Sequence, residues 1–187
     1  MKAAGHGDAK AQYRLSTMYY HGWGVRKDET EEKKWREMAA RGGHAQAQYE
    51  MGWIYQHSAG DAQDKAEAAK WYRKAAEQGH GRAQINLGEM YHSADGIPRD
   101  LTEAIKWYRE AKKQGQYTDD KIAAAEQFAA AEHGDSKSQY LLGEIYYSGK
   151  GVSKDETEAV KWLKKAADQG DSTLEDLIAE RSKTAAE

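Results

Sequence analysis

The stretch D-K-A-E-A-A-K-W-Y-R-K-A-A-E-Q-G, residues 64–79, decides the fold of this chain. Related stretches occupy residues 28–43, 100–115 and 155–170, and each has a tryptophan eight residues before its last glycine. The first three of these tryptophans, Trp35, Trp71 and Trp107, are 36 residues apart, and Trp162 follows further on. A fixed period of this length is typical of proteins built from stacked repeats.

Composition excludes several classes of protein. The chain has 187 residues, of which 39% are hydrophobic, and it contains six Trp and twelve Tyr, which argues against disorder. A net charge of -3 without a block of Lys or Arg predicts no binding to nucleic acid. No apolar run approaches 18 residues, so we expect no insertion into a membrane. The absence of cysteine excludes disulfides and thiol catalysis.

The N-terminus looks like the tail of a repeat. Residues 1–8 match residues 165–171, and they lack the apolar stretch of a signal peptide. We therefore expect that a segment upstream was removed. The sequence does not decide the cellular compartment. The chain as given would be cytoplasmic, and it would be periplasmic or secreted if a leader was cleaved. The truncated N-terminal end could also pair with a second copy, giving a homodimer.

Each full unit is predicted to be a helix–turn–helix. In the first unit, residues 9–21 place apolar and small side chains on one helical face, and glycines 22 and 24 end the helix. Asp28, with Glu31 three residues later, predicts a capping box at the start of the second helix. The same pair recurs in the other units: Asp64 with Glu67, Asp100 with Glu103, and Asp155 with Glu158. The full repeats are residues 9–44, 45–80, 81–116 and 136–171.

Small residues indicate that the helices pack closely. Positions 16, 52, 88 and 143 are Gly or Ser, and positions 39, 75, 111 and 166 are Ala. A single unit cannot bury both of its faces, so the units must stack into an all-α superhelix, or solenoid. Residues 172–187 depart from the pattern and are predicted to form a C-terminal capping helix. We expect a single repeat domain over residues 1–187.

Residues 117–135 interrupt the period and align with the second half of a repeat only. Asp119 occupies the capping position, and Glu126 replaces the tryptophan, for which Phe128 could compensate. We interpret this half repeat as a unit without its first helix, which leaves a lone helix at about residues 119–133. In the alternative, this helix simply fills the place of a first helix.

The repeated sequence resembles the Sel1-like repeat family, relatives of tetratricopeptide repeats. The resemblance rests on A-x-A-Q-Y-x-[LM]-G-x-x-Y, G-x-G-V-x-x-D-x-x-E-A and W-Y-x-K-A-A-E-Q-G over residues 9–171. It implies a solenoid, and it implies activity only weakly. Similar proteins are mostly bacterial scaffolds, adaptors and host-interaction factors. In related solenoids the first helices line the concave surface.

The first helices carry a second face, opposite the packing face, which we call the first-helix strip. Its members are Lys10, Tyr13, Thr17, Tyr20, His21, Gln46, Tyr49, Trp53, Gln56, His57, Arg82, Ile85, Glu89, His92, Lys137, Tyr140, Glu144 and Tyr147. All of these except His21, Gln46, Gln56, Ile85 and Lys137 are predicted to bind a partner, because aromatic and charged side chains anchor interfaces. Alternatively, the tyrosines at 13, 49 and 140 only pack against the next unit.

No catalytic, cofactor-binding or metal site is predicted. The seven histidines show no i, i+4 pair on one helix, and the repeated glutamates are explained by capping. No nucleophile elbow, P-loop or dinucleotide fingerprint is present. We expect a non-enzymatic scaffold or adaptor that binds a protein or peptide along the first helices. One alternative is an immunity or inhibitor protein that neutralises a secreted bacterial toxin, and another is a glycan-binding or hydrolytic module.

Overall fold

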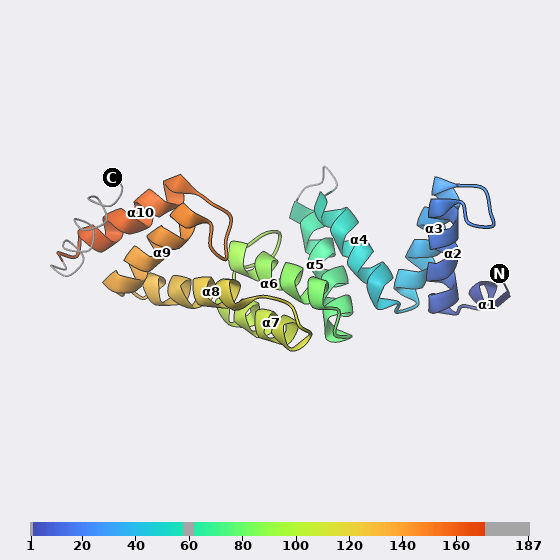
Figure 1. The fold of residues 1–187 in the computed structure, drawn as a ribbon, viewed down its shortest axis with the longest axis horizontal. Helices are drawn as coiled ribbons and strands as arrows, with labels where there is room; N and C mark the ends of the chain where they lie inside the picture. Colours follow the sequence, from blue (N-terminus) through green and yellow to red (C-terminus); the bar gives the residue numbers. More distant parts are fainter. Residues whose placement is uncertain (1, 58–61, 171–187) are drawn as a thin grey trace. The chain divides into compact units, whose positions relative to one another are not determined.

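The computed structural model describes residues 2–57 and 62–170, and within these residues all regular structure is helical (Figure 1). The prediction of an all-α repeat fold is confirmed. The chain divides into two compact units, Met1–Tyr117 and Thr118–Glu187. The predicted capping helix at 172–187 lies outside the described residues. The predicted division of the whole chain into four full repeats, a half repeat and a cap stays a prediction.

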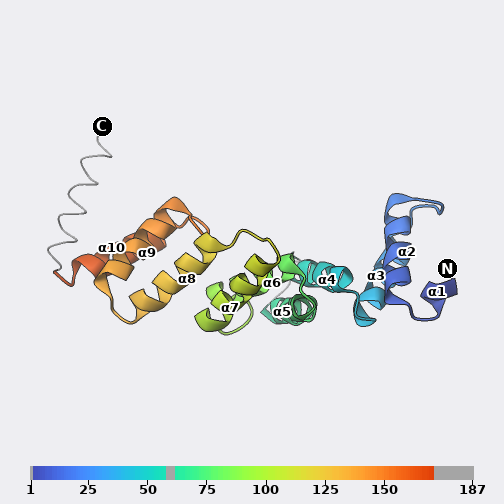
Figure 2. The ribbon, with the colours of Figure 1, turned by 60° about the horizontal axis from the view of Figure 1, so that its bottom comes forward.

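The first unit contains three helix–turn–helix pairs after a short N-terminal helix. The helices are α1 Lys2–Gly5, α2 Ala9–His21, α3 Glu29–Arg41, α4 Ala45–His57, α5 Ala62–Glu77, α6 Gly81–Ser93 and α7 Leu101–Lys113. α2 packs against α3, α4 against α5 and α6 against α7, as Figure 2 shows from a second side. α3 also contacts α4, and α5 contacts α6, so each of these three repeats packs on the next one.

The second unit contains α8 Asp119–Glu132, α9 Ser136–Ser148 and α10 Glu156–Ala167. α9 and α10 form the helix–turn–helix pair, and α8 packs against α9. The side chain of Phe128 on α8 is buried and meets Trp162 edge-on, with ring centroids 5.5 Å apart. An aromatic ring two residues after Glu126 thus supplies buried volume in a helix that has no tryptophan.

At three of the four predicted capping boxes, only half of the box forms. Asp28, Asp100 and Asp155 do cap their helices, because each carboxylate accepts a hydrogen bond from the amide N–H of the residue three positions later. The reciprocal bond is missing: the N–H of each aspartate instead donates to a tyrosine carbonyl of the preceding helix, at Tyr19, Tyr91 and Tyr146. These bonds join the two helices of one repeat. The glutamates are thereby free for other contacts, and Glu31 accepts from Trp35 Nε1 at 2.8 Å.

Two predicted caps are wrong. α5 begins at Ala62, so Asp64 lies inside the first turn, where a carboxylate interacts favourably with the helix dipole but does not cap. The N-cap of α8 is Thr118, which makes no side-chain capping bond, and Asp119 is the first helical residue.

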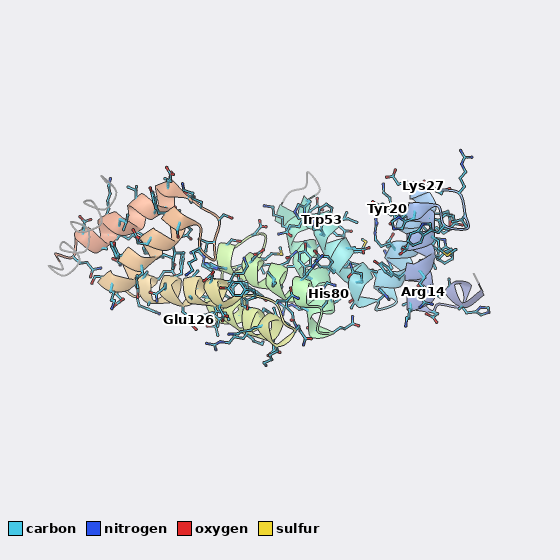
Figure 3. The ribbon with its side chains drawn as sticks, in the orientation of Figure 1. Arg14, Tyr20, Lys27, Trp53, His80 and Glu126 are labelled. Atoms are coloured by element: carbon cyan, nitrogen blue, oxygen red, sulfur yellow. The ribbon has the colours of Figure 1, made fainter. Side chains whose placement is uncertain are left out.

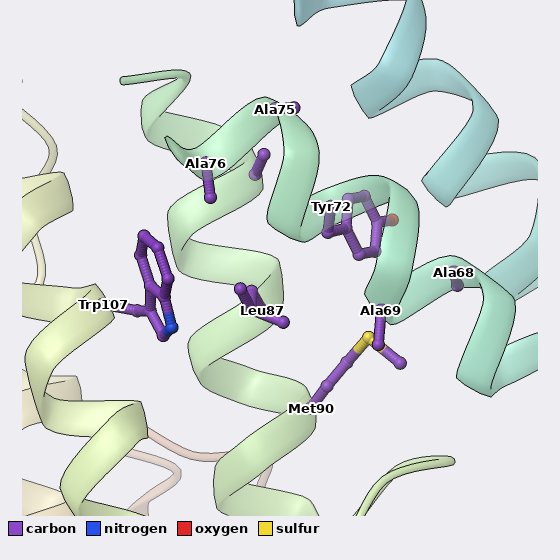
Figure 4. Packing of buried hydrophobic residues seen from close by; sticks show 9 residues of the cluster. Ala68, Ala69, Tyr72, Ala75, Ala76, Leu87, Met90 and Trp107 are labelled. Carbon is purple, nitrogen blue, oxygen red and sulfur yellow. The ribbon is translucent and has the colours of Figure 1, made fainter. Parts of the chain in front are cut away.

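The core is built from alanines, tyrosines and the repeated tryptophans. Figure 4 shows side chains of α5, α6 and α7 meeting around Leu87 and Met90, which are fully buried. Glycine is required where a tyrosine ring presses against the first helix of the same repeat: a Cβ on Gly52 would lie 2.6 Å from Tyr72, and one on Gly88 would lie 2.6 Å from Tyr108. The close helix approach predicted from the small residues is therefore present in these repeats.

A buried glutamine joins each repeat to the helix before it. The side-chain amides of Gln12, Gln48, Gln84 and Gln139 donate to the carbonyls of Ala4, Ala40, Ala76 and Ala131, over 3.0–3.2 Å. We call this contact the junction bond. Gln139 bonds to a carbonyl of α8, just as Gln84 bonds to a carbonyl of α5. α8 therefore makes the junction bond that the second helix of a full repeat makes elsewhere. The half-repeat interpretation of residues 117–135 itself stays a prediction.

The histidines at the ends of two repeats act as helix caps. His44 Nδ1 accepts from the N–H of Ala47, and His80 Nδ1 accepts from the N–H of Ala83. Asp8 and Asp135 are the equivalent N-cap residues of α2 and α9. A tyrosine of the preceding first helix stacks on each ring, Tyr13 on His44 at 4.3 Å and Tyr49 on His80 at 4.7 Å.

Candidate functional site in the first unit

A cleft of about 470 Å³ lies between α2 and α4. Figure 3 labels Tyr20 on α2 and Trp53 on α4, two of the exposed aromatic side chains that line it. The lining residues are Tyr13, Ser16, Thr17, Tyr20, His21, Glu32, Arg36, Gln46, Tyr49, Glu50, Trp53 and Ile54. A volume of this size falls in the range of pockets that bind small ligands or single side chains of a partner.

Two charged side chains of α3, Glu32 and Arg36, line the cleft. They are four residues apart, so they share one face of the helix and form an ion pair. Both side chains are largely buried, with 9% and 15% of their surface exposed. Arg36 Nε has no hydrogen-bond partner among the described residues. Burial raises the pKa of the Glu32 carboxyl above its usual range, and the Arg36 guanidinium opposes this shift.

A second carboxylate, Glu50 on α4, also lines the cleft. Its Oε1 atom accepts from the Tyr13 hydroxyl at 2.7 Å and from Gln46 Nε2 at 3.0 Å. The first of these bonds ties α2 to α4 across the cleft. Burial raises the pKa of the Tyr13 phenol, and the hydrogen bond to Glu50 raises it further, so Tyr13 remains a hydrogen-bond donor at neutral pH.

The exposed walls of the cleft are aromatic. Tyr20 is 66% exposed and Trp53 is 49% exposed. The imidazole of His57 stacks on the Trp53 indole, with centroids 4.4 Å apart, and its Nδ1 lies 2.9 Å from the Trp53 carbonyl. His21 packs edge-on against Tyr20 and stacks on Trp23. These contacts restrain the rings of Tyr20 and Trp53 and leave both partly exposed.

The cleft exists because the first repeat departs from the other repeats of its own chain. Where the first repeat has Arg36, the later ones have Tyr72, Tyr108 and Leu163, and where it has Glu32 they have alanines 68, 104 and 159. The facing residue is Ser16 instead of a glycine. An ion pair thus replaces the apolar contact that fills the equivalent space elsewhere. A buried ion pair contributes little to stability compared with apolar side chains of similar size, which points to a role other than packing.

The structure brings together five of the thirteen predicted partner-binding residues: Tyr13, Thr17, Tyr20, Tyr49 and Trp53. His21 and Gln46 of the first-helix strip also line the cleft. Tyr13 and Tyr49 also stack on His44 and His80, which cap the first helices of the next repeats, so these tyrosines do take part in packing between repeats. Their predicted role in binding a partner stays a prediction.

The remaining predicted residues do not line the cleft, although Lys10 and His57 lie on its helices α2 and α4. Lys10, His57, Arg82 and Tyr147 are exposed, and Glu89 and Glu144 are half-buried. His92 and Tyr140 are buried, at 6% and 5% exposure, and Tyr140 packs with Ala166 and Leu163. These two side chains do not offer a surface to a partner, because neighbouring helices cover them.

Sequence reasoning missed Glu32, Arg36, Glu50, Ser16 and Ile54. The signal for the first two was present in the sequence, as a glutamate in the place of alanine and an arginine in the place of tyrosine or leucine. This signal is visible only when the second helices are compared with one another for differences. It is missed when only the residues that they share are used to define the repeat.

A second cleft, of about 610 Å³, shares Tyr20, Glu32, Arg36 and Ile54 with the first. Several of its other charged residues have partners within the chain. Lys33 pairs with Glu29 at 2.5 Å, and Asp28 caps α3. We therefore regard the cleft between α2 and α4 as the candidate site.

The Sel1 repeat model matches residues 9–44, 45–80, 81–116 and 136–171, which is most of the chain. The chain belongs to the Sel1 repeat family. Sel1 repeat proteins are typically protein-interaction scaffolds and are generally not catalytic.

Two solved Sel1 repeat structures are similar to this chain. A Sel1 repeat protein from Oxalobacter formigenes is 36% identical, with a TM-score of 0.58, over 62% of this chain and 87% of that one. The protein c5321, a protective antigen present in uropathogenic Escherichia coli strains, is 35% identical, with a TM-score of 0.56. That match covers 92% of this chain and 41% of c5321.

A curated relative matches a shorter segment. The sel1-like repeat-containing protein L18 of Acanthamoeba polyphaga mimivirus is 50% identical over 40 residues, which are 21% of this chain. The match spans only 7% of that relative. In the described part of this chain, no Sel1 helix is both long and apolar enough to span a bilayer. The same residues contain no group of three or more His, Asp or Glu side chains placed to hold a metal ion.

Proposed function

We propose that this chain is a non-enzymatic interaction scaffold that binds a segment of a partner protein in the cleft between α2 and α4. One observation carries the proposal. In the first repeat alone, an ion pair replaces the apolar side chains of the other full repeats, and the cleft beside it is lined by exposed aromatic rings.

Tyr20 and Trp53 are suited to act as anchors. Aromatic side chains contribute a large contact area at a low cost in conformational entropy, and they dominate the binding energy of many interfaces. Both rings are restrained by neighbouring histidines, so little freedom remains to be lost on binding. We propose that the other exposed residues of the first-helix strip extend this surface. The toxin-neutralising and glycan-binding alternatives stay hypotheses, since no contact in the described residues favours them.

The test is a quantitative pull-down from a lysate of the source cells, using the full chain. We expect that Trp53→Ala combined with Tyr20→Ala weakens capture of the main partner by at least roughly tenfold, the loss typical of two anchor residues. The matched control is Tyr117→Ala, because Tyr117 is an exposed tyrosine, 76% accessible, that does not line the cleft. Unchanged capture by the double variant, with a native circular dichroism spectrum, contradicts a binding role for the cleft.

A further inference from the structure

The chain provides cations of its own for the aromatic rings of its second helices. A lysine ammonium lies over each repeated tryptophan: Lys34 over Trp35, Lys74 over Trp71, Lys106 over Trp107, and Lys165 over Trp162, at 4.0–5.6 Å from the ring centroid. Two first-helix rings outside the cleft also have a cation of the chain: Arg73 lies over Tyr91 on α6, and Lys154 lies over Tyr147 on α9. Contacts of this kind are favourable because the face of an aromatic ring carries negative potential.

The aromatic rings of the cleft differ from these rings. Within the residues that the structure describes, no lysine or arginine lies over the ring of Tyr13, Tyr20, Tyr49 or Trp53. Their ring contacts are with histidines and, for Tyr49, with Tyr72. The first-helix rings of the cleft therefore present faces that the chain itself leaves without a positive charge.

The charges that line the cleft are unequal. Glu32 and Glu50 supply two carboxylates, and Arg36 supplies one guanidinium, which is paired with Glu32. The charge of Glu50 is thus not balanced by a cation in the cleft. Its Oε1 atom accepts two hydrogen bonds from neutral groups, whereas its Oε2 atom accepts none from the described residues. A half-buried carboxylate with one unused oxygen favours a positively charged hydrogen-bond donor.

Building on the proposed function, we propose that the cleft receives an arginine or lysine side chain of the partner segment. The aliphatic part and the charge of that side chain lie against Tyr20 and Trp53, and its terminal N–H groups donate to Glu50 Oε2. An acidic side chain would be repelled by Glu50. An apolar side chain would remove water from Glu50 without replacing its hydrogen bonds, which is costly.

The inference is tested with the full ¹⁵N-labelled chain and a defined probe at pH 7.5. The probe is a capped decapeptide of glycine, serine and alanine with one central arginine. The matched peptide has citrulline, which keeps the shape of arginine but has no charge. Binding is followed by the indole N–H signal of Trp53, identified by its loss in Trp53→Phe. We expect the arginine peptide to shift this signal and to bind roughly tenfold more tightly than the citrulline peptide.

Two variants place the interaction at Glu50. Glu50→Gln keeps an acceptor for Tyr13 and the volume of the side chain, and we expect it to weaken binding of the arginine peptide by roughly fivefold or more. Glu77→Gln removes an exposed carboxylate outside the cleft and should leave the affinity unchanged.

Three results overturn the inference: no movement of the Trp53 signal at millimolar peptide, equal affinity for the citrulline peptide, or unchanged affinity of Glu50→Gln. The pull-down separates these failures from failure of the proposed function. If Trp53→Ala with Tyr20→Ala loses the partner while Glu50→Gln retains it, the cleft binds a partner but does not select a cation.

Discussion

The residue before each of four first helices accepts the same capping hydrogen bond, but it is aspartate at positions 8 and 135 and histidine at positions 44 and 80. The two types of capping residue differ in their response to low pH. A histidine caps only when Nδ1 is unprotonated. At His80 the proton then resides on Nε2, which lies 2.9 Å from Gln46 Oε1 and donates to it.

This difference predicts a pH dependence of stability. Burial lowers the pKa of both His44 and His80 from the ordinary value of about 6.5. A base whose pKa is lower in the folded state takes up a proton more readily when unfolded, so its contribution to stability is complete above about pH 6.5 and is lost as the pH falls below it. We expect the free energy of unfolding in urea to drop from pH 7.5 to pH 5.5.

The drop should be smaller in the double variant His44→Asp with His80→Asp, because aspartate stays charged and continues to cap in this range. His133→Asn, a change at an exposed histidine, serves as the control and should retain the wild-type slope. The explanation fails if the double aspartate variant loses as much stability as the wild-type chain.

Between helices, the junction bond is the recurring device. Gln48 has both ends of its amide occupied: Nε2 donates to the Ala40 carbonyl at 3.1 Å, and Oε1 accepts from Gln78 at 2.7 Å. Gln139 shows the same pair of bonds, with Ala131 and Gln169. Gln84 donates to Ala76, but its Oε1 atom is buried without a partner among the described residues.

Equivalent glutamines should therefore differ in what they contribute. Gln48→Met breaks two hydrogen bonds, and the Ala40 carbonyl keeps only the bond from the Gly43 N–H, so we expect it to lower the free energy of unfolding by about 1–3 kcal/mol. Gln84→Met breaks one bond and removes an oxygen that was already unpaired, so its cost should be smaller by roughly 0.5–1 kcal/mol. Urea unfolding of both variants at neutral pH measures the difference. An equal or larger cost at Gln84 would show that the second bond of Gln48 adds nothing.

Across the whole chain, the repeat period predicted most of the fold because it reports local chemistry repeated in phase. Helix caps at Asp28, Asp100 and Asp155 and small residues facing Tyr72 and Tyr108 depend only on neighbours within one repeat. Such contacts can be read from a single stretch and extended to the others.

The candidate site was less predictable, because exposure at one repeat position depends on what the adjacent helices place over it. Tyr20 and His92 occupy equivalent positions, yet one is exposed and the other is buried. The cleft itself arises from departures at Ser16, Glu32 and Arg36, which a search for similarity passes over.

Giving the first repeat the residues of the second repeat should increase the stability of the chain and abolish partner binding. The triple variant Ser16→Gly, Glu32→Ala and Arg36→Tyr gives the first repeat the residues of the second at these positions, including a glycine to receive the tyrosine ring. We expect the free energy of unfolding to rise by about 1–4 kcal/mol, because a buried ion pair is replaced by apolar packing. Capture of the partner in the pull-down should be lost.

The control is Glu110→Ala with Lys113→Ala, which removes an exposed ion pair of α7 with an N–O distance of 2.5 Å. It should change stability by less than about 1 kcal/mol and leave capture intact. Lower stability of the triple variant would mean that Glu32 and Arg36 hold the first repeat together.

The junction bond also has a consequence for the history of the gene. The same glutamine meets the same alanine carbonyl whether the preceding helix belongs to a full repeat, as with Ala76, or to the interrupted segment, as with Ala131. A duplication or deletion of the DNA between two junction bonds therefore leaves a glutamine facing an alanine carbonyl at the new connection between helices. We expect length variants of this protein to gain or lose sequence in steps that end just before a first helix, each step leaving a chain that still folds.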